Sequence, residues 1–134
     1  MSVKVIRRSR RSTGSLIGNL RRATRAVFLD AAERTKANVV GKILEGATLG
    51  AGHVPSLPGE APHADTGQLH QSYATSSLAS EDTVIIGSPL KYARDLELGT
   101  KKMAARPHLS PAFREELPKT RRNLRLAAKK AMRK

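Results

Sequence analysis

Three histidines and one aspartate lie near each other in the middle of the chain, and side chains of these types can bind metal ions or transfer protons. They are His53, His63, Asp65 and His70. Their spacing matches neither a helical zinc motif nor a zinc finger. We therefore interpret them as loop residues and predict no metal and no cofactor.

Other candidate catalytic groups lack the spacing that their chemistry requires. Ser56, His63 and Asp65 have the residue types of a hydrolytic triad, but no Gly-x-Ser-x-Gly nucleophile elbow surrounds the serine. Asp95 and Glu97 are two residues apart on an expected helix, so they point in different directions and form no acid/base pair. Glycines 46 to 59 lack the Gly-Lys-Ser/Thr ending of a phosphate loop. We predict that the protein is not an enzyme.

The most specific pattern is a pair of sequence blocks. Residues 55–69 read PSLPGEAPHADTGQL, and residues 87–113 read GSPLKYARDLELGTKKMAARPHLSPAF. The second block has the order of a turn, a short helix, a glycine stop and an extended segment with prolines. The residues that define the pattern are Pro58, Gly59, Glu60, Thr66, Gly67, Tyr92, Glu97, Gly99, Thr100, Arg106 and Pro107.

With these blocks the chain resembles the head-tail joining, or tail-completion, proteins of long-tailed phages. That family carries Pro-Gly-Glu-x-Pro and Thr-Gly, then Tyr-Ala, Glu, Gly-Thr and Ala-Arg-Pro, at these separations. The resemblance implies a structural virion protein of the neck or upper tail, made in the host cytoplasm and arranged as a hexameric ring around the DNA channel. Implied partners are further copies of the chain, a head-completion or stopper protein, the tail terminator and the tail tube. Pro118 departs from the family pattern.

The net charge of +14 is concentrated at the two ends of the chain. Residues 1–25 and residues 118–134 each contain eight Lys and Arg and no acidic residue, whereas residues 26–117 contain all 11 carboxylates against nine Lys and Arg. Such ends attract DNA or an acidic protein surface without reading base sequence. The cations assigned to these contacts are Arg7, Arg8, Arg10, Arg11, Arg21, Arg22, Arg25, Arg121, Arg122, Arg125, Lys129 and Lys130.

The basic ends leave two other interpretations open. The protein can be a nonspecific architectural protein that binds double-stranded DNA, or its ends can be a solvated helix face and a frayed tail. The sequence has no zinc-finger pattern, aromatic stacking set or basic zipper, which argues against a transcription factor. The two blocks favour the joining protein, because a DNA coat has no need of them.

Composition and periodicity predict one α+β domain. The chain has 134 residues, two Phe, two Tyr, no Trp and no Cys, so we expect a modest core of Leu, Ile, Val and Ala, without disulfides and helped by self-association. No secretory signal or membrane span is recognisable, and we expect no membrane contact. The predicted parts are a basic flexible arm (1–14), one α+β domain (15–117) and a basic C-terminal helix (118–134).

Within this domain, a long N-terminal helix and a C-terminal helix are expected to pack on a small antiparallel sheet. Apolar residues recurring from 15 to 45 predict a helix of roughly 40 Å that Gly46 ends. Residues 46–64 predict a long Gly/Pro-rich loop, which we interpret as an arm that docks on a neighbouring subunit. Residues 68–78 predict a helical turn leading into a strand, with further strands at 83–87 and 102–109 and a turn at 80–82.

The second block predicts the local geometry around its short helix. Pro89 should open that helix, with Leu90, Ala93, Leu96 and Leu98 on its apolar face, and Gly99 should end it in the left-handed conformation. We expect Glu97 and Arg106 either to pair across the turn or to remain two solvated charges. Ser110 should cap the last helix, and Pro118 should kink or restart it.

Overall fold

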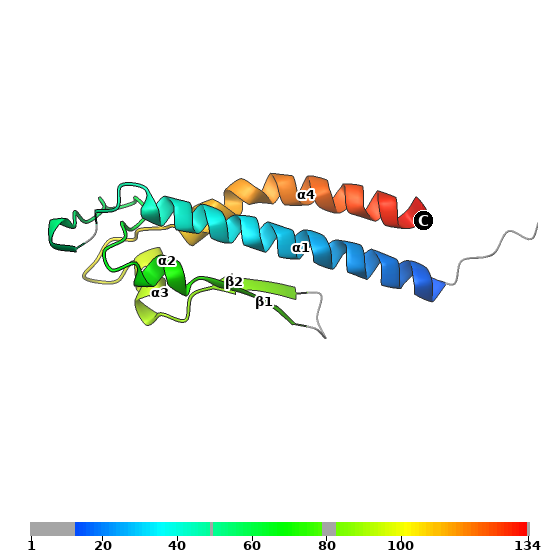
Figure 1. Ribbon diagram of the computed structural model, residues 1–134, viewed down its shortest axis with the longest axis horizontal. Helices are drawn as coiled ribbons and strands as arrows, with labels where there is room; N and C mark the ends of the chain where they lie inside the picture. The colour runs from blue at the N-terminus through cyan, green and yellow to red at the C-terminus, as the bar shows by residue number, and fades with distance from the viewer. Residues whose placement is uncertain (1–12, 49, 79–82, 134) are drawn as a thin grey trace, which may run out of the picture.

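The computed structural model describes residues 13–48, 50–78 and 83–133. The elements in chain order are α1 (Thr13–Leu44), the 3-10 turn η1 (Gly50–Gly52), α2 (Gln68–Ser72), β1 (Ala74–Leu78), β2 (Thr83–Gly87), α3 (Lys91–Leu98) and α4 (Leu109–Arg133). Helices α1 and α4 run antiparallel and side by side, and the β1–β2 hairpin packs against α1 (Figure 1). This arrangement confirms the predicted α+β fold of two long helices and a small antiparallel sheet.

The core is small and lies near the C-terminal half of α1. Ala31, Thr35, Val39 and Ile43 are buried at intervals of four residues, which places them on one face of the helix. The core continues through Ala64, Leu69, Tyr73, Ala93 and Ala112. Few large apolar side chains are fully buried, in agreement with the modest core that the composition predicts.

The sheet has two strands among the described residues, paired from Ala74 with Gly87 to Leu78 with Thr83. The predicted third strand at residues 102–109 is wrong, because the backbone of this segment bonds elsewhere. The Arg106 N–H donates to the Leu96 carbonyl at 2.6 Å, and the Ala105 carbonyl accepts from Gly59 N–H at 3.0 Å. The predicted turn at residues 80–82 lies outside the described residues.

Helix α3 differs from its prediction in two details. The helix begins at Lys91, after the Ser88 hydroxyl accepts the Leu90 N–H at 3.2 Å, so Pro89 precedes the helix instead of opening it. Leu98 is 67% exposed and does not join the apolar face that covers the core. Gly99 ends the helix as predicted, but with φ 75° and ψ 170°, an extended conformation at positive φ that only glycine adopts readily.

Helix α4 passes through Pro118 without a break. The predicted restart at Pro118 is therefore wrong, and residues 118–133 continue the helix that starts at Leu109. Pro118 has no N–H for the carbonyl four residues earlier, but the long contact with α1 holds the helix together on both sides of it.

The Gly/Pro-rich segment after α1 is irregular apart from η1, and parts of it fold back onto the domain. Ala64 N–H donates to the Ile43 carbonyl at 3.0 Å, and Ser56, Pro62 and Ala64 are buried. Val54 and Leu57, by contrast, are 60% and 66% exposed. The segment is thus fastened at its base and presents apolar side chains to the outside.

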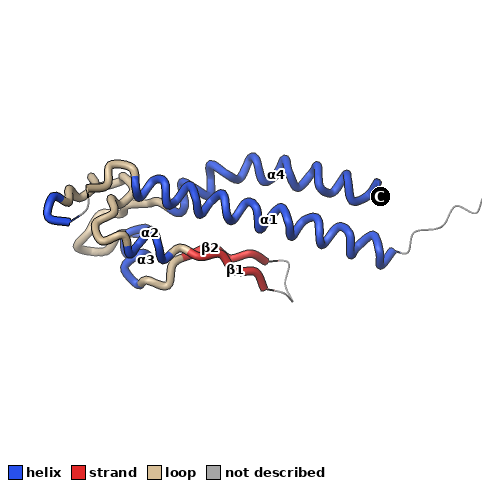
Figure 2. The backbone as a smooth tube through the Cα atoms, in the orientation of Figure 1, coloured by secondary structure: helices blue, strands red, loops and turns tan. Residues whose placement is uncertain are grey.

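The molecule is elongated, with different structure at its two ends (Figure 2). The loops, α2 and α3 gather at one end, which we call the motif end (residues 46–72 and 88–108). Because α1 and α4 are antiparallel, the start of α1 and the end of α4 meet at the other end, which we call the basic end (residues 13–29 and 117–133).

Candidate functional site

The motif end brings the two sequence blocks into contact. Gly59 N–H reaches the Ala105 carbonyl at 3.0 Å, and a cavity of about 340 Å³ is lined by residues of both blocks, including Thr66, Gly67, Tyr92 and Arg106. Residues about 40 positions apart in the chain therefore form one surface.

Several pattern residues shape the turns of this end. Glu60 N–H donates to the Leu57 carbonyl, and the Glu60 carboxylate accepts the Leu57 N–H, each at 3.1 Å, which closes a turn around Pro58 and Gly59. Thr66 accepts the N–H of Gln68 at 3.4 Å. Gly67 precedes α2 with φ 79°. Thr100 and Met103 exchange backbone hydrogen bonds of 2.8 and 3.3 Å.

Glu97 links α3 to the start of α4. Its carboxylate accepts the backbone N–H groups of His108, Leu109 and Ser110 at 2.9, 3.0 and 2.9 Å, which are among the N–H groups that a helix start leaves unpaired. Burial raises the pKa of Glu97, but these backbone hydrogen bonds and the Ser110 hydroxyl outweigh burial and lower the pKa to about 2. Glu97, and not Ser110 as predicted, caps the last helix.

The expected pair between Glu97 and Arg106 does not form. Among the described residues the His108 ring faces Glu97 instead, with its Nδ1 3.2 Å from the carboxylate. The Arg106 Nε is buried and has no hydrogen-bond partner. The alternative of two solvated charges does not hold either, because the Glu97 side chain is only 13% exposed.

His108 and Tyr73 complete a buried polar network that no motif or spacing in the sequence indicates. The Nε2 of His108 lies 2.5 Å from the Tyr73 hydroxyl, and its Nδ1 lies 3.0 Å from the Arg106 carbonyl. Because Nδ1 faces oxygen acceptors, it carries the hydrogen, and Nε2 accepts the Tyr73 O–H. Burial and the charge of Glu97 raise the pKa of Tyr73 to about 12.

This network contains residue types that can act in acid/base catalysis, but its position indicates a structural role. His108 is 0% and Tyr73 is 8% exposed, so neither side chain is accessible to a substrate. The two rings meet edge to face, with centroids 5.7 Å apart. The network joins the residue between α2 and β1 to the α3–α4 connection, and through Glu97 it fixes where α4 begins.

The triad candidates Ser56, His63 and Asp65 all line the motif-end cavity, as does His53, but the Ser56 hydroxyl has no hydrogen bond to His63. Among residues 13–48, 50–78 and 83–133, no group of three His, Asp or Glu side chains is placed to hold a metal ion. His53 and His63 direct Nδ1 at the carbonyls of Thr48 and Val54, at 3.3 and 2.9 Å. No helix in these ranges combines the length and apolar character needed to cross a bilayer.

The basic end contains Lys and Arg residues from both the N-terminal and the C-terminal parts of the sequence. Residues 13–29 of α1 and 117–133 of α4 contain no Asp or Glu, and the two helices pack along each other. Arg25 is half-buried and donates to the Ser77 hydroxyl at 3.1 Å. Arg7, Arg8, Arg10 and Arg11 lie outside the described residues. The remaining predicted contact residues are exposed: Arg21, Arg22, Arg121, Arg122, Arg125, Lys129 and Lys130.

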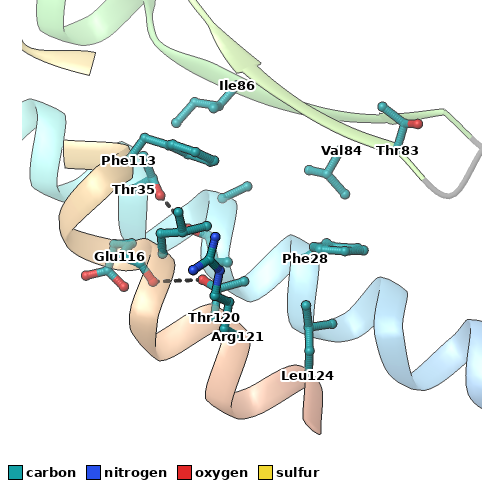
Figure 3. Close-up of a pocket in the computed structure, with 13 residues that line it drawn as sticks. Phe28, Thr35, Thr83, Val84, Ile86, Phe113, Glu116, Thr120, Arg121 and Leu124 are labelled. Carbon is teal, nitrogen blue, oxygen red and sulfur yellow. Dashed lines mark hydrogen bonds between the residues drawn. The ribbon is translucent and has the colours of Figure 1, made fainter. Parts of the chain in front are cut away.

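A groove of about 470 Å³ runs between α1, α4 and β2 (Figure 3). Phe28, Val84, Phe113 and Leu124 supply apolar walls. Two of its three threonines bond through their hydroxyls to carbonyls of their own helices, Thr35 to Ala31 and Thr120 to Glu116, so these two add little polarity. Glu116, which also lines the groove, pairs with the Arg34 guanidinium at 3.1 Å, and Arg34 pairs with Asp30 as well.

No protein-family model, curated protein or solved structure matches the chain.

Proposed function

We propose that this protein is a non-enzymatic structural component of a phage neck or upper tail, which joins the DNA-filled head to the tail tube. The observation that carries the proposal is the division of the subunit into two ends. One end consists of the turns and caps of the two sequence blocks, and the other is a pair of helix tips with many cations and no carboxylate. Helix α1, of 32 residues and about 48 Å, separates them.

In this proposal the subunits form a closed ring, with six copies as the resemblance implies. A ring needs a heterologous interface, in which one patch meets a different patch on the neighbour. The groove supplies a concave apolar patch, and half-exposed side chains supply candidates for the other patch. These are Ile17, Ile85, Leu126 and Met132, which are 51%, 50%, 58% and 56% exposed.

The basic end faces either the DNA of the channel or an acidic surface of an adjoining ring. Both contacts are electrostatic and need no base recognition. The motif end then faces a protein partner among the head-completion or stopper protein, the tail terminator and the tail tube.

Gradient sedimentation of lysate from cells producing the phage tests this proposal. The chain should sediment with tails or whole particles, both before and after DNase treatment. If DNase releases the chain from the fast-sedimenting fractions, the joining role is wrong.

The acid-free basic end also favours one alternative, a nonspecific coat of double-stranded DNA. A coat protein should bind any duplex, and the logarithm of its affinity should fall with the logarithm of salt concentration by about 0.9 per phosphate neutralised. Replacing the exposed cations Arg121, Arg122 and Arg125 with Gln should then abolish function, whereas a neck protein altered in this way should keep its subunit contacts.

A further inference from the structure

The cavity at the motif end is lined by an arginine whose side-chain Nε has no hydrogen-bond partner. Arg106 lines this cavity of about 340 Å³, and its Nε is buried without a hydrogen bond. No ion pair joins its guanidinium to any carboxylate in the described part of the chain. A buried charged donor of this kind is costly unless an acceptor reaches it.

A second unpaired donor lines the same cavity. Ser56 is 4% exposed, and its hydroxyl also has no hydrogen-bond partner. Native proteins pair nearly all buried polar groups, so two unpaired groups in one cavity point to a ligand that supplies oxygen acceptors. A planar guanidinium binds carboxylates through two parallel N–H···O bonds.

The backbone holds Arg106 in place before any ligand binds. Its N–H donates to the Leu96 carbonyl at 2.6 Å, and its carbonyl accepts from the buried His108 Nδ1 at 3.0 Å. Both partners belong to the helix and polar network that fix the start of α4. A site built on so fixed a backbone loses little entropy when it binds.

We propose that this cavity binds a carboxylate side chain of a partner protein, with the Arg106 guanidinium and the Ser56 hydroxyl as donors. The identity of the partner as a neck or tail protein rests on the proposed function, whereas carboxylate binding itself does not.

The surroundings favour a protein carboxylate over a DNA phosphate. Asp65 lines the cavity and Glu60 lies on the adjoining turn, so a polyanion such as DNA would meet more repulsion there than a single carboxylate would. The cations of the basic end, which contains no Asp or Glu, lie at the opposite end of the molecule. Val54 and Leu57, which flank the Pro55–Ser56 wall in the chain, are exposed and suit apolar residues beside a single carboxylate.

An NMR titration of the full-length protein tests the site. The probe is the tripeptide N-acetyl-Leu-Glu-Leu-amide, and its matched control carries Gln in place of Glu. The Glu peptide should shift the Arg106 Nε–H and Ser56 amide resonances to saturation, with an affinity at least about tenfold above that of the Gln peptide. The same Glu peptide should raise the melting temperature of the unaltered protein. This second measurement tests the site without any substitution.

Substitutions then assign the donors. Arg106→Lys should weaken binding about tenfold, because lysine cannot form the two-bond fork, and Ser56→Ala should weaken it by a smaller factor. Arg94→Lys, an exposed position on α3, is the matched control and should leave the affinity unchanged.

Three results would overturn the inference: no saturable shift with the Glu peptide, equal binding of the Gln peptide, or displacement of the Glu peptide by a short DNA duplex. The last result would identify phosphate as the ligand. Because the titration uses isolated protein, its failure leaves the sedimentation test of the joining role unaffected, and the reverse also holds.

Discussion

Glu97→Gln should destabilise the protein by about 2 kcal/mol at pH 7. The carboxylate accepts three backbone N–H groups at the start of α4, at 2.9, 3.0 and 2.9 Å. Replacing a helix-capping side chain costs about 0.5–2 kcal/mol. Lowering the pKa from 4.5 to about 2 sets an upper limit of about 3 kcal/mol for the ionised form.

The sign of the pH dependence follows from the lowered pKa. Glu97 is ionised in the folded protein down to about pH 2, whereas in the unfolded chain it takes up a proton near its ordinary pKa of 4.5. Its stabilisation is therefore complete above about pH 5 and is lost as the pH falls towards 2. More than half of the difference between the two proteins should disappear between pH 7 and pH 3.

Urea unfolding followed by circular dichroism measures this effect at both pH values. At pH 7 the midpoint of Glu97→Gln should fall by about 1 M urea. Asp95→Asn, which removes an exposed carboxylate from the same helix, is the control and should change stability by less than about 0.5 kcal/mol. An unchanged midpoint at pH 7, or a deficit that persists in full at pH 3, would refute the capping role of Glu97.

Three further predictions concern the network, a glycine and the basic end. Tyr73→Phe leaves a buried histidine nitrogen unpaired and should cost about 1–3 kcal/mol in urea unfolding. The pKa of Tyr73 is raised to about 12, so the unaltered protein should lose stability as the pH rises from 10 to 12. The Tyr73→Phe variant should lose less stability over the same range. Gly99→Ala should lower the melting temperature sharply, because Gly99 has φ 75° and the new Cβ would lie 2.8 Å from the backbone nitrogen of Ala105. Gly41→Ala is the control: it lies in open space within α1 and should raise the melting temperature slightly. If the basic end contacts DNA, Arg121→Gln with Arg122→Gln should reduce the log-log salt slope of duplex binding by about 1–2, and an unchanged slope would place DNA elsewhere.

Elements specified by nearby residues could be predicted from the sequence. The long first helix and the strand at 83–87 follow from apolar periodicity and β-branched residues, and both lie within a few residues of their expected bounds. The end of α3 follows from Gly99, because no other residue type tolerates its backbone conformation.

Features made by residues far apart in the chain were missed or wrong. Local rules favour Ser110 as the cap of the last helix, but a carboxylate 12 residues before Leu109 occupies that role. The predicted strand at 102–109 fails for the same reason, since loop 46–67 and α3 take its backbone hydrogen bonds. Charge counting located the cations at both chain ends, but only the antiparallel packing of α1 and α4 shows that they meet.

The position of the described chain ends bears on how the protein can be handled. Helix α1 starts and α4 stops at the same tip of the molecule. An affinity tag joined directly to the start of α1 or to the end of α4 would therefore lie beside the cationic surface, where it can mask contacts with a polyanion. Conversely, a protein immobilised at either of these helix ends presents its turns and the Arg106 cavity to the solution, which suits a search for the protein partner.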